Sequence, residues 1–201
     1  MPNVIGPRGF VPSRYANGSC WNGAMNLYYI PSTDGSVFSV GDAVVSAAGG
    51  DANGVPAVAK ALGTDAVRGV IQGVLVSAPG DPSLVGVDLS LSTQNVPAAK
   101  LKGYYVMVVD DPAVLFELAD DGLAALTATS CNKNATFTVA NPVAPRQNSA
   151  SVLSTASVGI LATLNLKVMG LVQKPNNAFG VNAAWLVKFN QHELQGATAG
   201  L

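Results

Sequence analysis

Glycine and proline interrupt this chain so often that long regular elements have little room to form. The sequence contains 21 Gly and 12 Pro, and the segments between them are mostly short and rich in Val, Leu, Thr and Tyr. Short segments of that composition, bounded by turn residues, are typical of β-strands. The sequence therefore predicts an all-β fold, a β-sandwich or a barrel-like arrangement of antiparallel sheets, with few short helices.

Apolar and polar residues alternate most clearly in two segments near the C-terminus, Leu161–Val168 and Val181–Phe189. Because successive side chains of a strand point to opposite faces, a period of two predicts a strand in each segment. The turn-forming residues 173–177 between them predict an antiparallel hairpin. Further strands are predicted at Asn26–Ile30, Ala43–Ala47, Val70–Val76, Gly103–Asp110, Val114–Ala119 and Ala135–Val139.

Helical signals are sparse. Pro56–Leu62 predicts two helical turns, and the pair Asp120–Asp121 predicts the cap of a short helix that ends at Leu126. Residues 141–155 are rich in Pro, Ser, Asn and Ala. That composition predicts a flexible loop, or a linker between two lobes of the β-rich domain, which we expect to span residues 26–201.

The first 25 residues combine frequent Gly and Pro with the aromatic residues Phe10, Tyr15 and Trp21. The segment is too interrupted for regular structure and too aromatic for a free tail. It therefore predicts an extended N-terminal arm that anchors on protein, either on a neighbouring subunit or on its own core. In the first case Phe10, Tyr15 and Trp21 are the interface residues, because aromatic side chains dominate interface energy.

Charged residues are scarce. Lys and Arg number 11 and Asp and Glu 12, which makes 11% of the chain, whereas globular domains average about 25%. Depletion of charge marks the centres of protein interfaces, and the net charge of −1 supplies little self-repulsion. The composition therefore predicts a subunit of a larger protein assembly.

The same composition argues against several partners and locations. The cations are scattered singly rather than in a basic stripe, so we expect no direct binding of nucleic acid. No apolar run is long enough to cross a bilayer, and no secretory signal is recognisable, so we expect the host cytoplasm as the site of assembly. Cys20 and Cys131 match neither a zinc site nor a disulfide scaffold, so we expect reduced thiols.

Residues suited to catalysis are few. His192 is the sole histidine, and its polar neighbours predict a solvated side chain; a nucleophilic pair with Cys20 would require the fold to bring them together. The pairs Asp110–Asp111 and Asp120–Asp121 fit turns at strand ends better than acid and base partners. Glycine motifs for phosphate or dinucleotide binding are absent from the sequence. We therefore predict no enzyme, no cofactor and no metal.

Five turn and strand segments follow one another along the chain, namely Gly6–Phe10, Asn26–Pro31, Gly41–Val44, Val109–Glu117 and Gly170–Leu194. Their order resembles that of capsid cement proteins, also called head decoration proteins, of tailed bacteriophages. The resemblance implies a β-rich subunit, commonly a homotrimer, that sits over junctions between major capsid proteins and stiffens the shell after expansion. It also implies a place on the capsid exterior of the virion.

Sequence and resemblance together predict a virion structural protein whose partner is the major capsid protein. Two other classes remain open. A tail or receptor-binding component of a phage would share the β-rich, charge-poor composition. A hydrolase of envelope polysaccharide or peptide would require Cys20 or the paired carboxylates to converge in a cleft.

Overall fold

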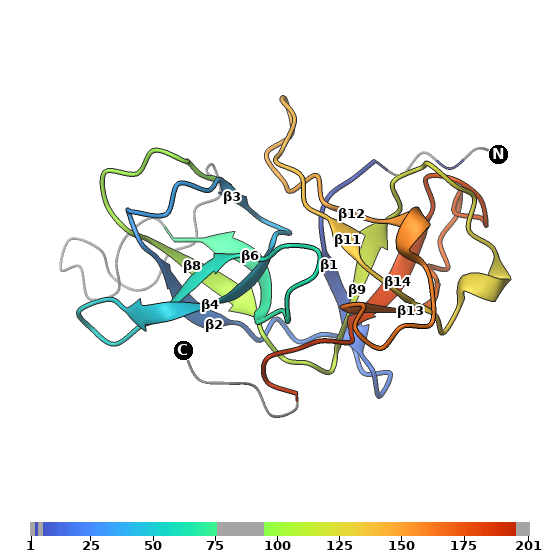
Figure 1. Cartoon of the computed structure of the whole chain (residues 1–201), viewed down its shortest axis with the longest axis horizontal. Coiled ribbons are helices and arrows are strands. Elements are labelled where there is room, and N and C mark those ends of the chain that lie inside the picture. The colour runs from blue at the N-terminus through green and yellow to red at the C-terminus, as the bar shows by residue number, and fades with distance from the viewer. Residues whose placement is uncertain (1–2, 4–5, 76–94, 196–201) are drawn as a thin grey trace.

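The computed structural model describes residues 3, 6–75 and 95–195 of the chain. Its described part is built almost wholly from β-strands, which confirms the predicted all-β class. The helical residues within this part form two single turns of 3₁₀ helix, Ala128–Ser130 and Thr155–Ser157. The strands gather into two lobes, a closed barrel and a five-stranded sheet, which lie side by side (Figure 1).

The barrel lobe is closed by five strands in the order β2, β5, β4, β6, β8. Neighbouring strands are antiparallel, except that β2 and β5 run parallel. A short pair, β3 (Phe38–Ser39) with β7 (Asn95–Val96), adds its apolar side chains to the barrel interior. The barrel strands are β2 (Asn26–Ile30), β4 (Ala43–Gly50), β5 (Pro56–Lys60), β6 (Gly69–Val74) and β8 (Tyr104–Val109).

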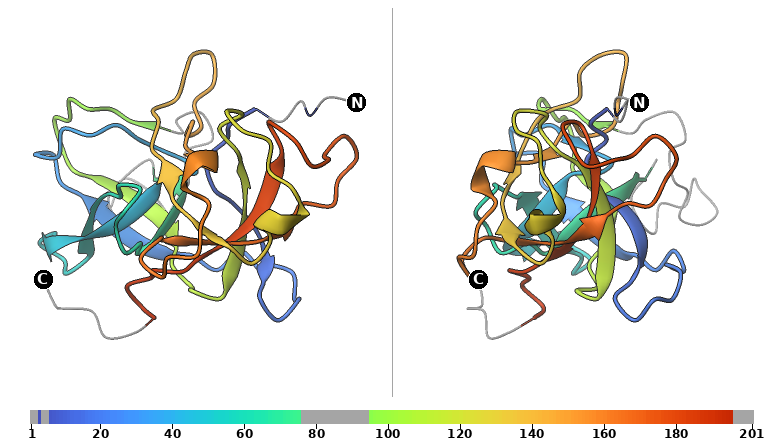
Figure 2. Two further views of the ribbon diagram at one scale, coloured as in Figure 1. Left: turned by 45° about the vertical axis from the view of Figure 1, so that its right-hand side comes forward. Right: turned by 90° about the vertical axis from the view of Figure 1, so that its right-hand side faces the viewer.

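The sheet lobe contains five antiparallel strands in the order β1, β9, β14, β13, β10. Its middle strands run next to one another on the side shown in the right panel of Figure 2. A separate antiparallel pair, β11 with β12, packs over the inner face. The strands are β1 (Val11–Tyr15), β9 (Val114–Ala119), β10 (Asn134–Ala135), β11 (Phe137–Thr138), β12 (Val152–Leu153), β13 (Leu166–Leu171) and β14 (Ala184–Phe189).

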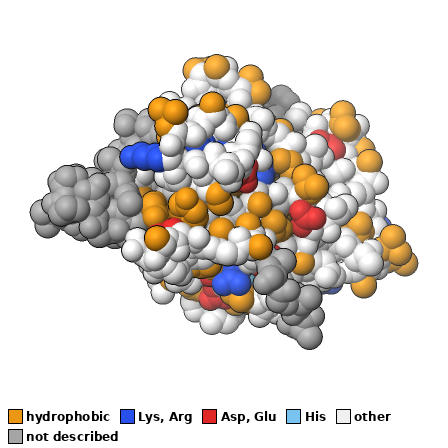
Figure 3. All heavy atoms as spheres, turned by 60° about the vertical axis from the view of Figure 1, so that its left-hand side comes forward, with side chains coloured by type: hydrophobic (Ala, Val, Ile, Leu, Met, Phe, Trp, Pro, Cys, Tyr) orange, Lys and Arg blue, Asp and Glu red, His pale blue; other side chains and the backbone are white. Residues whose placement is uncertain are grey.

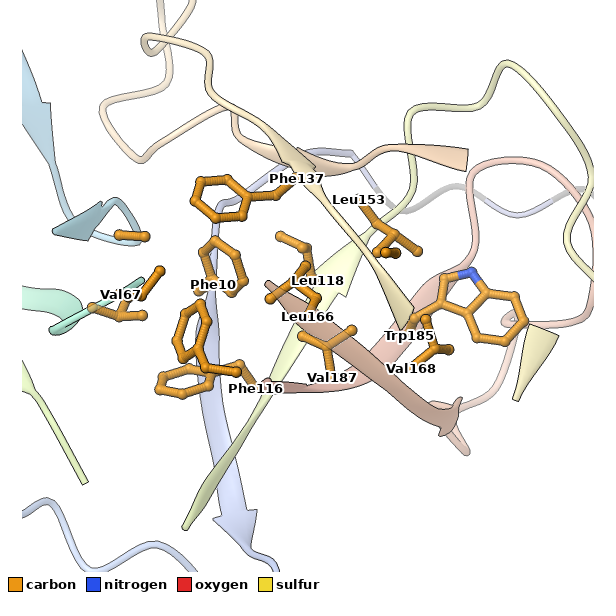
Figure 4. Packing of buried hydrophobic residues seen from close by; sticks show 14 of the residues in the cluster. Phe10, Val67, Phe116, Leu118, Phe137, Leu153, Leu166, Val168, Trp185 and Val187 are labelled. Atoms are coloured by element: carbon orange, nitrogen blue, oxygen red, sulfur yellow. The ribbon is translucent and has the colours of Figure 1, made fainter. Parts of the chain in front are cut away.

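One hydrophobic core joins the two lobes. The ring of Phe10 lies at its centre, with its centroid 5.1 Å from those of Phe137 and Phe189 and 6.1 Å from that of Phe116 (Figure 4). Val67, from the segment that leads into β6, approaches the same cluster from the barrel. Residues of both lobes bury apolar surface in this cluster, while the interior of the barrel holds a second, separate cluster.

The predicted C-terminal hairpin is present, because β13 and β14 pair antiparallel. Its first strand, however, begins at Leu166 rather than at Leu161. The amide of Asn190 donates hydrogen bonds to the carbonyl oxygens of Ala162 (3.1 Å) and Leu164 (2.9 Å), which holds residues 161–165 in a turn. Carbonyl groups that bond to a side chain in this way are not used in hydrogen bonds between strands, so the strand begins only after them.

Both predicted helices are wrong. Pro56–Lys60 is strand β5, because its backbone pairs with β4 and contacts β2 in the barrel. After β9, the side chain of Asp120 accepts the N–H of Gly122 at 2.9 Å, and Gly122 has a φ of +69°. This local turn with a left-handed residue diverts the chain before a helix can start.

The N-terminal segment is not an arm set apart from residues 26–201. Strand β1 pairs with β9 and so forms one edge of the sheet. Phe10 is 0% exposed, and its backbone N–H donates to the carbonyl oxygen of Gly41 at 2.9 Å. Of the two alternatives open at the level of sequence, anchoring on its own core is the one present. The burial of an aromatic ring fixes the segment, because such a ring removes a large apolar area from water.

Residues 141–155 leave the sheet lobe as a projecting loop and return into β12 (Figure 1), so they are not a linker between the lobes. The base of the loop is tied to the barrel lobe. The N–H of Ser149 donates to the carbonyl oxygen of Val40 at 2.9 Å, and Lys60 Nζ donates to Asn141 Oδ1 at 2.8 Å.

The central place of Phe10 predicts a large loss of stability on truncation. Phe10→Ala leaves a cavity where both lobes meet, so we expect the free energy of unfolding to fall by about 3–5 kcal/mol. Chemical denaturation followed by fluorescence measures the change. Leu101→Ala, at a fully exposed position, is the control and should change stability by less than about 0.5 kcal/mol. Equal losses in the two variants would show that the two lobes do not share this core.

Candidate functional site

The most extensive set of interacting polar side chains lies where the barrel meets the sheet lobe; we call it the junction cluster, formed by Asn26, Tyr28, Arg68, Asp110 and Glu193. Tyr28 Oη donates to Asp110 Oδ2 at 2.7 Å, and Asn26 Nδ2 donates to Asp110 Oδ1 at 2.8 Å. Arg68 Nε donates to Tyr28 Oη at 2.8 Å. The Arg68 guanidinium lies 4.0 Å from both Asp110 Oδ2 and Glu193 Oε2.

Strand pairing places these groups. Asn26 and Tyr28 are two positions apart on β2, so their side chains share a face. Asp110 directly follows β8, the antiparallel neighbour of β2, and begins the turn that carries the chain into β9. Arg68 precedes β6, the other neighbour of β8. The cluster therefore sits at the mouth of the barrel on the side of the sheet lobe.

Burial controls the state of Tyr28. Removal from water, followed by the hydrogen bond to Asp110, raises the pKa of its phenol to about 12. The hydroxyl thus remains a hydrogen-bond donor throughout the neutral range, while its oxygen accepts from Arg68. The guanidinium also lies 5.4 Å from the centroid of the Tyr28 ring. Donor and acceptor are both used within the fold, which suits a structural tie and leaves no group poised for proton transfer.

The segment that follows β14 closes over the junction cluster. Val67 N–H donates to the carbonyl oxygen of Gln191, and the N–H of Glu193 donates to that of Val67, both at 3.0 Å. The carboxylate of Glu193 accepts from the backbone N–H of Ser46 at 2.9 Å and from its hydroxyl. The segment therefore connects the last strand of the sheet lobe to β4 and β6 of the barrel.

His192 belongs to this segment and is only 3% exposed, so the prediction of a solvated histidine is wrong. Its ring centroid is 6.2 Å from that of Phe189, and its Nδ1 accepts the N–H of Leu194 at 3.1 Å. Burial lowers the pKa of His192 to about 4, although the carboxylate of Asp110 acts in the opposite direction. The imidazole is therefore neutral at pH 7.

The structure does not bring the sequence's catalytic candidates together. Cys20 is exposed beside the turn that follows β1, whereas His192 is enclosed, so no nucleophile and base pair forms between them. Cys131 is a free, half-buried thiol. The turn role predicted for Asp110–Asp111 is confirmed, because the Asp111 side chain accepts the N–H of Ala113 at 2.7 Å.

The second acidic pair also forms turns, and Asp120 does more than was predicted. Its buried carboxylate accepts the backbone N–H groups of Asn182 (2.7 Å) and Ala183 (3.0 Å) and the indole N–H of Trp185 (3.2 Å). Together with the N–H of Gly122 these donors leave no room for a substrate or ion on this carboxylate. Asp120 thus fixes the entry into β14.

A third buried acid, Asp42, was missed by sequence reasoning. Its Oδ2 lies 3.0 Å from Lys60 Nζ, and burial raises the pKa of its carboxyl group. Lys60 also donates to the carbonyl oxygen of Val37 and to Asn141, both at 2.8 Å. The partners come from distant parts of the chain, so no local motif marks them. This pair ties the projecting loop to the barrel.

The three aromatic residues predicted at an interface differ in placement. Phe10 is enclosed in the core, so its assignment to an interface is corrected. Tyr15 and Trp21 are half-buried and pack against that core. Tyr15 Oη donates to Asn22 Oδ1 at 2.8 Å, which holds the ring against its own turn. These two side chains retain some exposed surface and remain candidates for contact with a neighbour.

Within the described residues, no group of three or more His, Cys, Asp and Glu side chains is arranged to hold a metal ion. Across the same ranges, no helix is long and apolar enough to cross a membrane. No protein family, curated protein or solved structure matches the chain.

Burial of neutral His192 predicts a pH-dependent loss of stability. The unfolded histidine binds a proton below about pH 6.5, whereas the folded one does so only near pH 4. Stability is therefore complete above pH 6.5 and falls as the pH drops toward 4, by about 3 kcal/mol. The raised pKa of Asp42 acts in the opposite sense in part of this range, so a matched variant is required.

His192→Asn is the matched variant. The amide oxygen of the new side chain can accept the N–H of Leu194, as His192 Nδ1 does, and the amide does not titrate. Thermal unfolding between pH 4 and 7 should show a much flatter profile for the variant than for the wild type. Parallel profiles would mean that His192 is accessible to protons in the folded state.

The junction cluster predicts a specific cost for loss of one hydroxyl. Tyr28→Phe removes one of the two side-chain donors to the buried Asp110 and the hydroxyl that accepts from Arg68 Nε, so we expect a loss of about 1–3 kcal/mol in the free energy of unfolding. Tyr104→Phe on β8 is the control, because the described structure gives the Tyr104 hydroxyl no hydrogen bond. Denaturant titration compares them, and equal stabilities would contradict a structural role for the cluster.

Proposed function

We propose that this chain is a virion structural protein that binds the outer surface of a bacteriophage capsid, at junctions between major capsid proteins, and stabilises the expanded shell. We further propose that it acts as a homotrimer and not as an enzyme. The observation that carries the proposal is a surface poor in charge and rich in exposed apolar side chains, on a scaffold whose buried acids are used as structural ties.

The described surface exposes ten large apolar side chains. On the barrel side of the molecule, charged side chains are few and lie apart among apolar and neutral ones (Figure 3). Interfaces are depleted in charge at their centres, so such a surface suits contact with other protein over several faces. The exposed residues are Leu62, Leu101, Leu123, Val143, Ile160, Leu161, Met169, Phe179, Val181 and Leu194.

Three of these residues, Leu123, Phe179 and Val181, come from two adjacent loops of the sheet lobe; we call them the loop-end patch. The loops are joined because the N–H of Gly180 donates to the carbonyl oxygen of Leu126 at 3.2 Å. Phe179 is 50% exposed, and its ring centroid is 5.9 Å from that of the buried Trp185. A side chain already fixed by packing loses little freedom on binding, which favours a role as an anchor.

Cement function needs no catalytic group, because it works through mass action. A protein that binds only the expanded lattice stabilises that lattice by its binding free energy, about 2.7 kcal/mol for one site at a free concentration of 100 Kd. Contacts repeated around a symmetric shell increase the effective affinity. Moderate apolar contacts on several faces are therefore sufficient.

Several observations favour this function over a hydrolase. The carboxylates of Asp42, Asp110 and Asp120 are buried and bound to donors from their own subunit. Cys20 and His192 are not paired. A tail component of a phage would share the surface described here, and only its location on the particle would differ.

The proposal predicts selective binding to expanded shells. Purified protein should co-sediment with expanded shells of the phage that encodes it, should not bind unexpanded shells, and should raise the melting temperature of the former. Phe179→Ala should weaken binding by about 2 kcal/mol, or roughly thirtyfold. Lys102→Ala is a truncation at an exposed position outside the apolar set and serves as the control. Equal binding to both forms of the shell, or to neither, would contradict the proposal.

A further inference from the structure

The outer face of the five-stranded sheet concentrates positive charge. Residues directly opposite each other in antiparallel strands share a face, and Lys167 of β13 lies opposite Lys188 of β14. Arg14 of β1 lies opposite Leu115 of β9, whose neighbours Val114 and Phe116 point into the core. We call this surface the basic face. Lys174, just after β13, joins it through its ion pair with Glu117 of β9.

The charge on the basic face is not balanced within the subunit. Strands β1, β9, β10, β13 and β14 contain one acidic residue, Glu117, which is paired with Lys174. No ion pair is formed by Arg14, Lys167 or Lys188 within the described residues. Two lysines directly opposite each other on a strand pair repel and destabilise the sheet. The whole chain has a net charge of −1, so this local excess is a feature of one face.

Between the cations the basic face is apolar. Leu115, Val172, Ala184 and Leu186 form a small cluster on this side of the sheet, separate from the main core. A cavity of about 220 Å³ is lined by Val172 and Leu186 of this cluster and by the charged residues Arg14, Glu117 and Lys174. A ligand that fits this surface must offer carboxylates to the cations and apolar side chains to the floor.

We propose that the basic face is a docking surface for an acidic protein segment that carries apolar side chains between its carboxylates. Charge complementarity specifies the occupant, because opposite charges steer and register the two surfaces while apolar contact supplies affinity. The outward positions of these strands provide no aromatic platform on which bases could stack, so nucleic acid fits poorly. The assignment of this acidic segment to the capsid lattice rests on the proposed function. The affinity of the basic face for an acidic peptide does not depend on that function.

The first test uses a short synthetic peptide of repeating Glu-Leu and does not depend on a capsid. Titration into ¹⁵N-labelled protein should shift the amide signals of Leu186, Lys188 and Lys167, and added salt should weaken the binding. Shifts confined to another part of the molecule would overturn the proposal. So would stronger binding by an oligothymidylate of equal charge, which would indicate a nucleic-acid surface.

Charge reversal gives the matched variants. The double variant K167E/K188E keeps a like-charged pair at the same two positions, so its stability should match the wild type while peptide affinity falls at least about tenfold. Single K188E creates an opposite-charge pair, so it should raise the melting temperature and still weaken binding. K102E, at an exposed site before β8, is the control. Equal loss of affinity in K102E and K167E/K188E would overturn the proposal.

Binding to expanded shells then separates this inference from the proposed function. If wild type binds shells and K167E/K188E binds them equally well, the basic face is not the docking surface, although the function stands. If the peptide binds the basic face but shells are not bound, the docking surface stands and the capsid function fails. Loss of both peptide and shell binding in K167E/K188E supports the two together.

Discussion

The structure depends on one shared hydrophobic core. Phe10 near the N-terminus, Phe137 in the middle and Phe189 near the C-terminus meet in it, so distant parts of the chain are fixed in one place. Because barrel and sheet both bury apolar surface there, they form a single scaffold rather than two independent lobes. That arrangement holds β1 at the edge of the sheet and leaves the opposite face of the sheet to solvent, where Lys167 and Lys188 lie.

The chain has few charged residues, and three of its aspartates form hydrogen bonds inside the fold. Asp42, Asp110 and Asp120 are 0%, 7% and 4% exposed and accept hydrogen bonds from distant segments. Burial of a carboxylate is costly unless such partners compensate it. These residues therefore act as ties between loops and strands, and they leave the outer surface still poorer in charge than the composition alone implies. The remaining excess on the basic face stands out for that reason.

Sequence patterns predicted the parts of the fold that local alternation determines. The bounds of Asn26–Ile30 and Val114–Ala119 were predicted correctly, and both strands bury apolar residues at alternate positions, Tyr28 and Ile30 in the first and Val114, Phe116 and Leu118 in the second. Pro56–Lys60 was mistaken for a helix, since partners on β4 and β2 decide its conformation. The junction cluster could not be predicted, because Tyr28 and Asp110 are 82 positions apart and only the barrel brings them together. His192 has polar sequence neighbours, yet its ring packs on Phe189.

A cryo-EM map of the phage particle to which we propose to assign the protein tests the central claim most directly. Cement function predicts density for the protein on the outside of the expanded head, over junctions between major capsid proteins, with the basic face against acidic residues of the lattice. Density for the protein at the tail alone, or a particle that contains none of it, would contradict the account.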